Sequence, residues 1–380
     1  MVYQLLHLSD LHLDASFAAD GIASSVGDWR RSDLRATVGR ILALARERRV
    51  DAVTIGGDLY DQDYVLPDTG EFLAQQFARL APMRVLITPG EHDPYTSRSL
   101  YSLTRWPPNV HIFTQSQLAP VQLTPDIQVW GAAHPAPQGN RVVERVHVER
   151  SGINILLLHA AERDETGSGA EAHFVVDASS VQNAGFDFVL LGHRHTARVW
   201  PDEAPRCVYP GSPEPLCWDE SKGGHNVVLL TVDGGQIHFD RIPISQWRYW
   251  TAEVDLTDCC SPDDAIQRIR HALSVAPGRP DERLVCRVIL TGLPDFDLDC
   301  AALVNGLETK AHVQLKTRLT LRHDFDQLAV EQTVRGLLVR RFQTRLAEVH
   351  DPGDRHAILK ALALALDALD GRQVRPHEVA

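Results

Sequence analysis

Ala52-Val-Thr-Ile-Gly-Gly-Asp-Leu-Tyr-Asp61 joins a short apolar run to a pair of carboxylates. The run, Ala52 to Ile55, is typical of a buried strand, and the two glycines after it end the strand. Asp58 and Asp61 follow this break directly. Open α/β sheets bind ligands at the carboxyl ends of their strands, so the segment predicts a functional carboxylate there. A structural turn capped by an Asx side chain would give the same pattern, so the segment alone is a weak signal.

Four other apolar runs end in carboxylates or imidazoles in the same way. These ends are Asp10 and His12 after Val2 to Leu8, Glu91 and His92 after Met83 to Thr88, His159 after Ile153 to Leu158, and His193 and His195 after Phe188 to Leu191. Two residues that lie two positions apart on extended backbone project to the same side, so we expect Asp10 and His12 to aim at one point. Helical patterns at 32–48 and 69–80 alternate with these runs, which predicts an α/β fold.

Carboxylates and imidazoles without cysteine favour divalent ions such as manganese, iron or zinc. The candidate ligands are Asp10, His12, Asp58, Glu91, His159, His193 and His195. Seven ligands suffice for two ions if one carboxylate bridges them, and Asp58 is the natural bridge because it stands alone on a central strand. Two ions about 3.5–4 Å apart can activate a water molecule and hold a phosphoryl group in line.

Composition limits the class of protein. A length of 380 residues predicts two domains plus a tail, and 44% hydrophobic with 23% charged residues is ordinary for a globular enzyme. The net charge of −12 argues against a uniformly basic surface for nucleic acid, although a nucleic-acid substrate can still be held by metal ions. Six cysteines without a Cys-x-x-Cys pair fit reduced thiols, and no signal peptide or apolar span is visible, so we expect a cytoplasmic protein without membrane contact.

The pattern changes after Pro243. Residues 246–325 read as a small β-α-β-α-β unit without acidic or histidine residues at its strand ends, which predicts a second domain that caps the first. Its last strand, Val313 to Arg322, carries a basic row that includes Lys316, Arg318 and Arg322. This row is either a solvated face or a contact surface for a phosphate backbone.

Two other regions complete the prediction. Residues 326–380 read as a tail of two helices, Leu328 to Val349 and Asp354 to Asp370. Leu and Ala in the second helix extend beyond one stripe, so the tail packs on the cap or also binds a partner helix. Residues 94–125 show no clear periodicity, and we expect them to be irregular.

Taken in order, Asp-x-His, Gly-Asp-x-x-Asp, Gly-Glu-His-Asp, a lone His and Gly-His-x-His resemble the motifs of the calcineurin-like metallophosphoesterases. Leu6 to Leu13, Val50 to Asp61 and Tyr209-Pro-Gly-Ser212 are similar to the DNA-repair exonuclease branch of that family, the SbcD type. The resemblance implies a four-layer α-β-β-α metallophosphoesterase sandwich at 1–245, a small α+β capping domain at 246–325, and C-terminal helices at 326–380 that dock on an ATPase.

The resemblance also implies roles for single residues. One ion would be held by Asp10, His12 and His195, the other by Glu91, His159 and His193, and Asp58 would bridge them. His92 would contact the scissile phosphate or the leaving oxygen, as electrostatic stabiliser or general acid. Asp61 and Asp93 would orient the metal ligands without binding an ion themselves. Glu91 departs from the family, which has Asn at this position.

The implied function is a two-metal-dependent DNA phosphodiesterase of DNA repair, with 3′→5′ exonuclease and single-strand endonuclease activity. Manganese is the expected metal, with iron or zinc as alternatives, and the expected partners are DNA, an SMC-like ATPase and a second copy of the chain. A small-molecule phosphoesterase is the first alternative, although such an enzyme does not need the cap and the tail. A scaffold of the ATPase complex with weakened catalysis is the second, and Glu91 is the residue that favours it.

Overall fold

The structure is a computed structural model that describes residues 2–17, 24–133, 141–148, 152–163, 174–201, 206–278, 281–292, 294, 296, 298–319, 325–349 and 351–371. The chain divides into two compact units. The first consists of Met1–Trp250 and Glu282–Val285, and the second of Thr251–Asp281 and Cys286–Ala380.

Two six-stranded sheets make up the first unit within the described residues. One has the order β14-β13-β1-β2-β3-β4, with β1 (Tyr3–Leu8), β2 (Ala52–Ile55), β3 (Arg84–Ile87), β4 (Val110–Ile112), β13 (Asn226–Asp233) and β14 (Gln236–Pro243). The other has the order β11-β12-β10-β7-β6-β5, with β5 (Ala119–Thr124), β6 (Ile127–Gly131), β7 (Ile153–His159), β10 (Phe188–Gly192), β11 (Arg198–Trp200) and β12 (Cys207–Tyr209). The short strands β8 (Ala161–Glu162) and β9 (Val175–Val176) pair separately.

The central strands of the first sheet, β1, β2 and β3, are buried on both faces. In β1, Leu6 and Leu8 pack with α1 (Ser24–Arg48) and α2 (Thr69–Ala78), whereas Leu5 joins the core between the two sheets. Burial on both faces requires an almost continuous apolar run, which is the pattern that the sequence shows.

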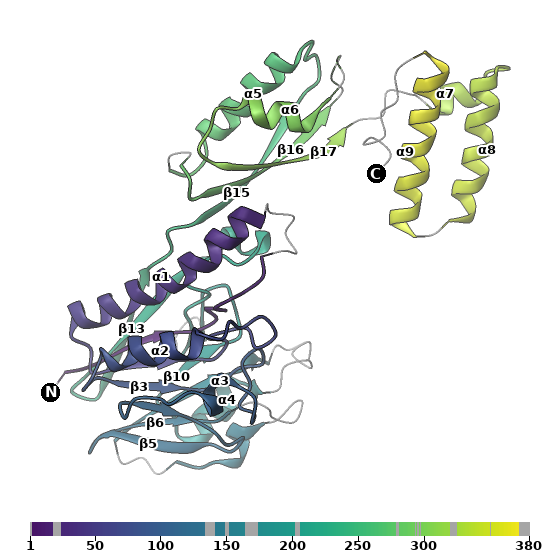
Figure 1. The fold of residues 1–380 in the computed structure, drawn as a ribbon. Helices are drawn as coiled ribbons and strands as arrows, with labels where there is room; N and C mark the ends of the chain where they lie inside the picture. The colour runs from purple at the N-terminus through teal and green to yellow at the C-terminus, as the bar shows by residue number, and fades with distance from the viewer. Residues whose placement is uncertain are drawn as a thin grey trace. The chain divides into compact units, whose positions relative to one another are not determined.

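The second sheet mirrors this arrangement. In β7, Leu156 and Leu158 pack with α4 (Ala178–Ala184), whereas Ile155 and Leu157 face the core between the sheets. Helices therefore cover the outer face of each sheet, and the layers follow the order α-β-β-α (Figure 1). This confirms the predicted fold class.

The pairing of the central strands sets the direction of the strand ends that carry the candidate ligands. β1, β2 and β3 are parallel neighbours, with Leu8 opposite Ile55 and Ile55 opposite Ile87. In the other sheet β7 and β10 are parallel, with His159 opposite Gly192. Within each sheet, the carboxyl ends of these strands therefore meet at one edge.

The expectation that residues 94–125 are irregular is wrong. This region contains α3 (Leu100–Leu103) and the strands β4 and β5, each of which lies at the end of its sheet. β4 has three residues, all of them partly exposed, and β5 contains Pro120. Edge strands tolerate proline and need only part of the apolar signal of a central strand, so their pattern is weak.

The second unit contains β15 (Arg248–Asp255), α5 (Pro262–Ser274), β16 (Leu284–Gly292), α6 (Cys300–Gly306) and β17 (His312–Leu319), and β15 and β16 begin in the first unit. The strands form a sheet in the order β15-β16-β17. This sequence of elements is the predicted β-α-β-α-β pattern. The Ser261 side chain accepts a hydrogen bond from the backbone N–H of Asp264, which fixes the start of α5.

The tail differs from its prediction in one respect. The expected helix Leu328 to Val349 is two helices, α7 (Phe325–Ala329) and α8 (Val334–Glu348). The break occurs because the Thr333 hydroxyl caps the N–H of Gly336 at 3.2 Å and so starts a new helix. α9 (Pro352–Leu369) then packs on α8, and the buried residues between the helices are Leu328, Val339, Leu362 and Leu366. In the described residues, the structure contains no helix that is long and apolar enough to cross a membrane.

Candidate metal centre

Glycines bring the ends of β2 and β10 together across the two sheets. A Cβ at Gly192 would collide with the carbonyl oxygen of Gly56. Gly57 has a φ of +92°, and a Cβ there would lie 2.5 Å from Nδ1 of His159. The two sheets can approach this closely only because these positions lack side chains. The Gly-Gly-Asp and Gly-His sequences are therefore the places where the two halves of the site meet.

The seven predicted ligands form two groups that share Asp58. Ligand atoms of Asp10, His12 and His195 lie within 4.8 Å of one another, and so do those of Glu91, His159 and His193. Oδ2 of Asp58 lies 3.7 Å from Nε2 of His12 and 3.3 Å from Nε2 of His159, which places it between the groups. The structure thus brings all seven residues together, and their role as ligands remains a prediction.

The backbone reaches this arrangement by a route that the sequence did not predict. Asp10, His12, Asp58 and His193 have φ values of 55°, 49°, 50° and 101°, so none of them has extended backbone. Asp10 and His12 converge as expected, but the predicted reason, their spacing of two on extended backbone, is wrong. Hydrogen bonds from their N–H groups to the carbonyl oxygens of Gly57 and Asp58, both 3.0 Å, hold the turns. Non-glycine residues in this strained region gather at functional sites.

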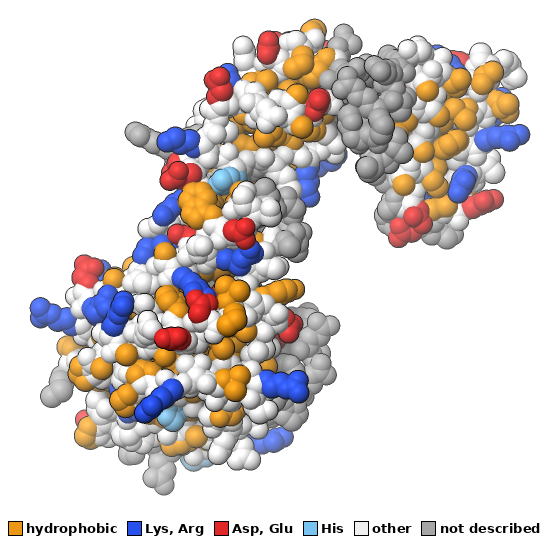
Figure 2. Space-filling view, in the orientation of Figure 1, with side chains coloured by type: hydrophobic (Ala, Val, Ile, Leu, Met, Phe, Trp, Pro, Cys, Tyr) orange, Lys and Arg blue, Asp and Glu red, His pale blue; other side chains and the backbone are white. Residues whose placement is uncertain are grey.

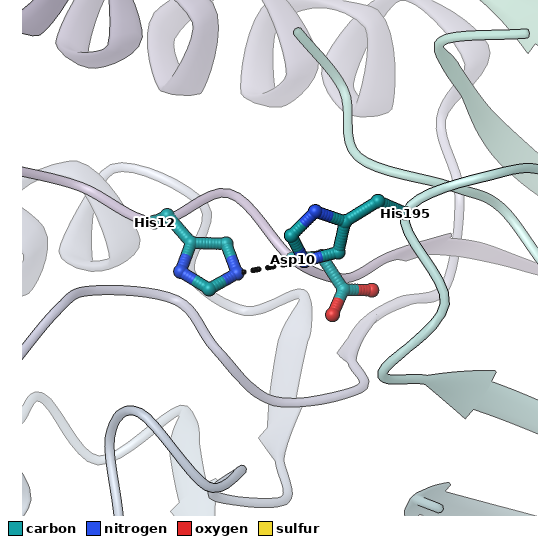
Figure 3. Close-up of side chains that lie close together, drawn as sticks. All are labelled: Asp10, His12 and His195. Atoms are coloured by element: carbon teal, nitrogen blue, oxygen red, sulfur yellow. Dashed lines mark hydrogen bonds between the residues drawn. The ribbon is translucent and has the colours of Figure 1, made fainter. Parts of the chain in front are cut away.

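Figure 3 shows the first group, in which a ring nitrogen of His12 and one of His195 point toward each other beside Asp10. Their Nε2 atoms are 3.1 Å apart. Nδ1 of His12 lies 2.6 Å from a carboxylate oxygen of Asp61, and Nδ1 of His195 lies 2.7 Å from one of Glu220. A carboxylate accepts hydrogen bonds, so each Nδ1 carries a proton, and Nε2 is the ring nitrogen left to bind a second proton or a metal ion.

At 3.1 Å, the two Nε2 atoms repel each other unless a proton or a metal ion lies between them. Oδ2 of Asp10 is held by the Ser9 hydroxyl at 2.5 Å and Oδ1 by the N–H of His193 at 2.9 Å, so this carboxylate is fixed beside the same point. Two imidazole nitrogens and a carboxylate oxygen are donors that divalent transition metals accept. The residues present therefore fit a divalent ion.

Electrostatics in the site favour cations. Burial lowers the pKa of His12, but the carboxylates of Asp61, Asp58 and Asp10 more than offset this and raise it to about 9. Burial alone would raise the pKa of Asp58, yet His159, His12 and His92 hold it well below its usual value. The carboxylates thus create a strongly negative site in which either a proton or a metal ion is bound.

The site is deep at one side and open at the other. The side chains of Asp58 and His159 are 2% and 1% exposed, whereas that of His92 is 55% exposed. The ring of His92 lies 5.0 Å from the ring of His12, at the open side. His92 therefore lies at the open side of the site, and its contact with a substrate phosphate stays a prediction.

Asp61 and Asp93 lie behind the candidate ligands. Asp61 contacts His12, as described above, and Oδ1 of Asp93 accepts hydrogen bonds from the N–H groups of Asp58 at 3.0 Å and Gly90 at 2.5 Å. Oδ2 of Asp93 accepts from the N–H of Leu59 and the hydroxyl of Tyr101. Burial and the charge of Asp58 raise the pKa of Asp93 to about 7, against the effect of these donors. These contacts orient the ligand-bearing turns, as expected of supporting groups.

The predicted DNA-contacting residues belong to the second unit. Lys316 and Arg318 on β17 are exposed, and Arg318 forms an ion pair with Glu253 at 2.5 Å. This pair compensates part of the charge of the basic row. Arg322 lies outside the described residues.

Glu220 contacts the candidate ligand His195 through its side chain and was not predicted from the sequence. It lies in the short 3₁₀ helix η3 (Trp218–Lys222), far from any apolar run that ends in a ligand. The available signal was Tyr209-Pro-Gly-Ser212, whose Ser212 hydroxyl donates to Glu220 at 2.7 Å. From the sequence alone, that motif indicated a family resemblance and no contact with a candidate ligand.

Comparison with known proteins gives the same result as the geometry. A profile of the calcineurin-like phosphoesterase family matches residues 3–197. The uncharacterized metallophosphoesterase YhaO of Bacillus subtilis (strain 168) is 25% identical over 283 residues, which cover 71% of this chain and 67% of that protein. Two proteins named DNA double-strand break repair protein Mre11 are also similar.

The Mre11 of Aeropyrum pernix is 25% identical over 293 residues, which cover 71% of this chain and 68% of that protein. The Mre11 of Sulfurisphaera tokodaii is 27% identical over 251 residues, covering 61% of this chain and 60% of that protein. The family match spans about half of the chain and includes every strand end that carries a candidate ligand. The chain belongs to the calcineurin-like phosphoesterase family and is a metal-dependent hydrolase.

Proposed function

We propose that the chain is a two-metal-dependent DNA phosphodiesterase of DNA repair, with 3′→5′ exonuclease and single-strand endonuclease activity. The observation that carries this proposal is the extent of the similarity to the two break-repair proteins. The Aeropyrum pernix protein aligns with 71% of this chain, whereas the family profile stops at residue 197. The likeness therefore continues beyond the part that all such phosphoesterases share.

The residues of the site divide the work of phosphodiester hydrolysis. Bound divalent ions, for which manganese is our first expectation and iron or zinc the alternatives, would supply an activated water and charge to polarise the phosphate. Asp58 would keep the two ion positions at a fixed separation, because it lies between the two groups of candidate ligands. His92 would contact the phosphate or the leaving oxygen from the open side, as a hydrogen-bond donor to developing charge or as a general acid.

A nuclease assay separates this function from its alternatives. With manganese present, we expect the full-length protein to degrade linear double-stranded DNA from its 3′ ends and to cut circular single-stranded DNA. Chelation should abolish both activities, because the ligand groups need a metal ion to act. Hydrolysis of small phosphodiesters without any cleavage of either DNA would instead favour the small-molecule phosphoesterase. Metal binding without hydrolysis of any ester would favour the scaffold.

We further propose that the C-terminal helices dock on an SMC-like ATPase and that the chain acts as a homodimer in the cytoplasm. Figure 2 shows apolar side chains gathered on the visible face of these helices. Val334 and Leu337 on α8 are 69% and 50% exposed, although exposed positions of a helix are normally polar, and Val330 in the turn before α8 is 76% exposed. Exposed apolar residues at helical spacing are typical of a surface that binds another protein.

Substitution on α8 tests the docking surface. We expect Val334→Ser/Leu337→Ser to lose co-purification with the ATPase, because apolar surface supplies most of the binding energy in such an interface. Cleavage of a small phosphodiester should stay within about twofold of the unchanged protein, because both residues lie in the second unit. The matched control is Arg341→Ser/Arg345→Ser, two exposed polar positions on the same helix. Equal capture of the ATPase by both double variants would place the docking site elsewhere.

A further inference from the structure

The carboxylate of Glu220 is buried and fully engaged. Its side chain is 7% exposed, and its Oε1 lies 2.7 Å from Nδ1 of His195 and 3.4 Å from Sγ of Cys217. Oε2 accepts hydrogen bonds from the Ser212 hydroxyl at 2.7 Å and from the N–H of Leu216 at 2.9 Å. Four donors leave this carboxylate little freedom to turn, so it presents a fixed acceptor to the imidazole.

The backbone of His195 is held by the same segment. The N–H of Ser212 donates to the carbonyl oxygen of His195 at 2.9 Å. Gly211 has a φ of +81°, and a Cβ there would lie 2.8 Å from that carbonyl oxygen. Tyr209-Pro-Gly-Ser212 therefore fits closely against His195, and its serine connects the backbone of His195 to the carboxylate that contacts the ring.

A fixed acceptor at Nδ1 has a chemical consequence at the other ring nitrogen. It keeps the proton on Nδ1, so that Nε2 retains its lone pair and points toward Nε2 of His12, 3.1 Å away. A carboxylate behind a ligating histidine also makes the ring a stronger donor. Asp61 gives His12 the same support at 2.6 Å, so both rings of this group have a carboxylate partner.

We propose that Glu220 is a positioning residue that holds His195 in the tautomer and orientation needed to bind a divalent cation together with Asp10 and His12. The inference rests on the proposed role of His195 as a metal ligand. Glu220 itself lies on the far side of the ring from that cation, so it acts through His195.

The chain offers a matched control in Glu214. This carboxylate is six positions away, its side chain is 1% exposed, and it accepts hydrogen bonds from Thr37, Arg40 and Ser245. It contacts none of the seven candidate ligands within the described residues. Glu214→Gln therefore removes a comparable buried charge from the same segment without changing the support of His195.

The experiment titrates Mn²⁺ into the metal-free full-length protein and its variants by calorimetry. We expect Glu220→Gln to weaken one of the two Mn²⁺ affinities by about tenfold and Glu220→Ala by about 100-fold, the range found for partners of ligating histidines. Ser212→Ala, which removes only one donor to Glu220, should weaken the same ion a few-fold. Glu214→Gln should leave both Mn²⁺ affinities within about twofold of those of the unchanged protein. We expect its melting temperature to fall as much as that of Glu220→Gln.

His195→Ala distinguishes the proposed role of His195 as a metal ligand from the proposed role of Glu220 as a positioning residue. It should weaken the same ion as Glu220→Gln, and adding Glu220→Gln to it should cause no further loss, because Glu220 acts only through that ring. If His195→Ala leaves both affinities unchanged, the assignment of His195 as a ligand fails. If His195→Ala behaves as expected but Glu220→Gln binds Mn²⁺ like the unchanged protein or like Glu214→Gln, the positioning role alone is overturned.

Discussion

Asp58→Asn should reduce phosphodiesterase activity at least about 10³-fold at saturating manganese, which corresponds to several kcal/mol of transition-state stabilisation. Oδ2 of Asp58 lies between His12 and His159, so its charge serves both groups of ligands. Asn has the same shape and can still accept a hydrogen bond from the N–H of His92, which Oδ1 of Asp58 now accepts at 2.9 Å. The substitution therefore removes the charge and leaves the packing of the turn almost unchanged.

The measurement is hydrolysis of a small phosphodiester across a manganese titration, together with the melting temperature of each metal-free protein. Asp63→Asn is the control, because Asp63 is exposed and lies five positions away on the loop after the site. It should retain full activity. If Asp58→Asn kept full activity, the interpretation of Asp58 as the shared ligand of two ions would have to be abandoned.

The central strands of the fold could be predicted because each of them is buried on both faces. Leu5 and Leu6 of β1 face different cores, so both must be apolar, and the run stands out from the sequence. Edge strands carry no such requirement, and β4 and β5 were missed for that reason.

The start of α1 could not be predicted from local sequence. The helix begins at Ser24, eight residues before the apolar stripe predicts, and Gly27 lies within its first turns. Arg30 in this part is 1% exposed, donates to the carbonyl oxygen of Pro215, and lies 4.6 Å from the ring centre of Trp247. Pro215 and Trp247, both far from Arg30 in the sequence, thus hold a segment whose own helix propensity is low, which is an effect of tertiary structure.

The candidate ligands could be predicted because each of them follows a strand end, where the topology forces side chains together. The support of His195 could not be predicted, since Glu220 reaches it from a loop whose course no periodicity describes. The left-handed backbone conformation of Asp10 and His12 could not be predicted from the sequence either. It is held by hydrogen bonds to the backbone of Gly57 and Asp58, which follow β2. Local pattern therefore identifies the candidate ligands, and tertiary contacts determine how their side chains are oriented.

The resemblance to the family implies Asn at the position of Glu91, and Glu91→Asn tests what the glutamate does. Oε1 of Glu91 lies 3.3 Å from Nδ1 of His193, and its ligand atom belongs to the group with His159 and His193. The hydrogen bond from His193 lowers the pKa of Glu91 to about 2, although burial opposes this, so the side chain is ionised at neutral pH. Compared with Asn, it adds one negative charge beside the cation.

We expect Glu91→Asn to weaken binding of one Mn²⁺ at least about tenfold, or about 1.4 kcal/mol, by calorimetry on the metal-free protein. Turnover at saturating manganese should be kept or raised, because less negative charge then opposes the charge that develops on the phosphate. Glu91→Gln is the control for side-chain length, since it removes the charge and keeps the reach of the side chain. It should weaken the same ion, which assigns the effect to charge. Tighter binding in the Asn variant would show that Glu91 points away from the metal and that the second ion is held by His159 and His193 without it.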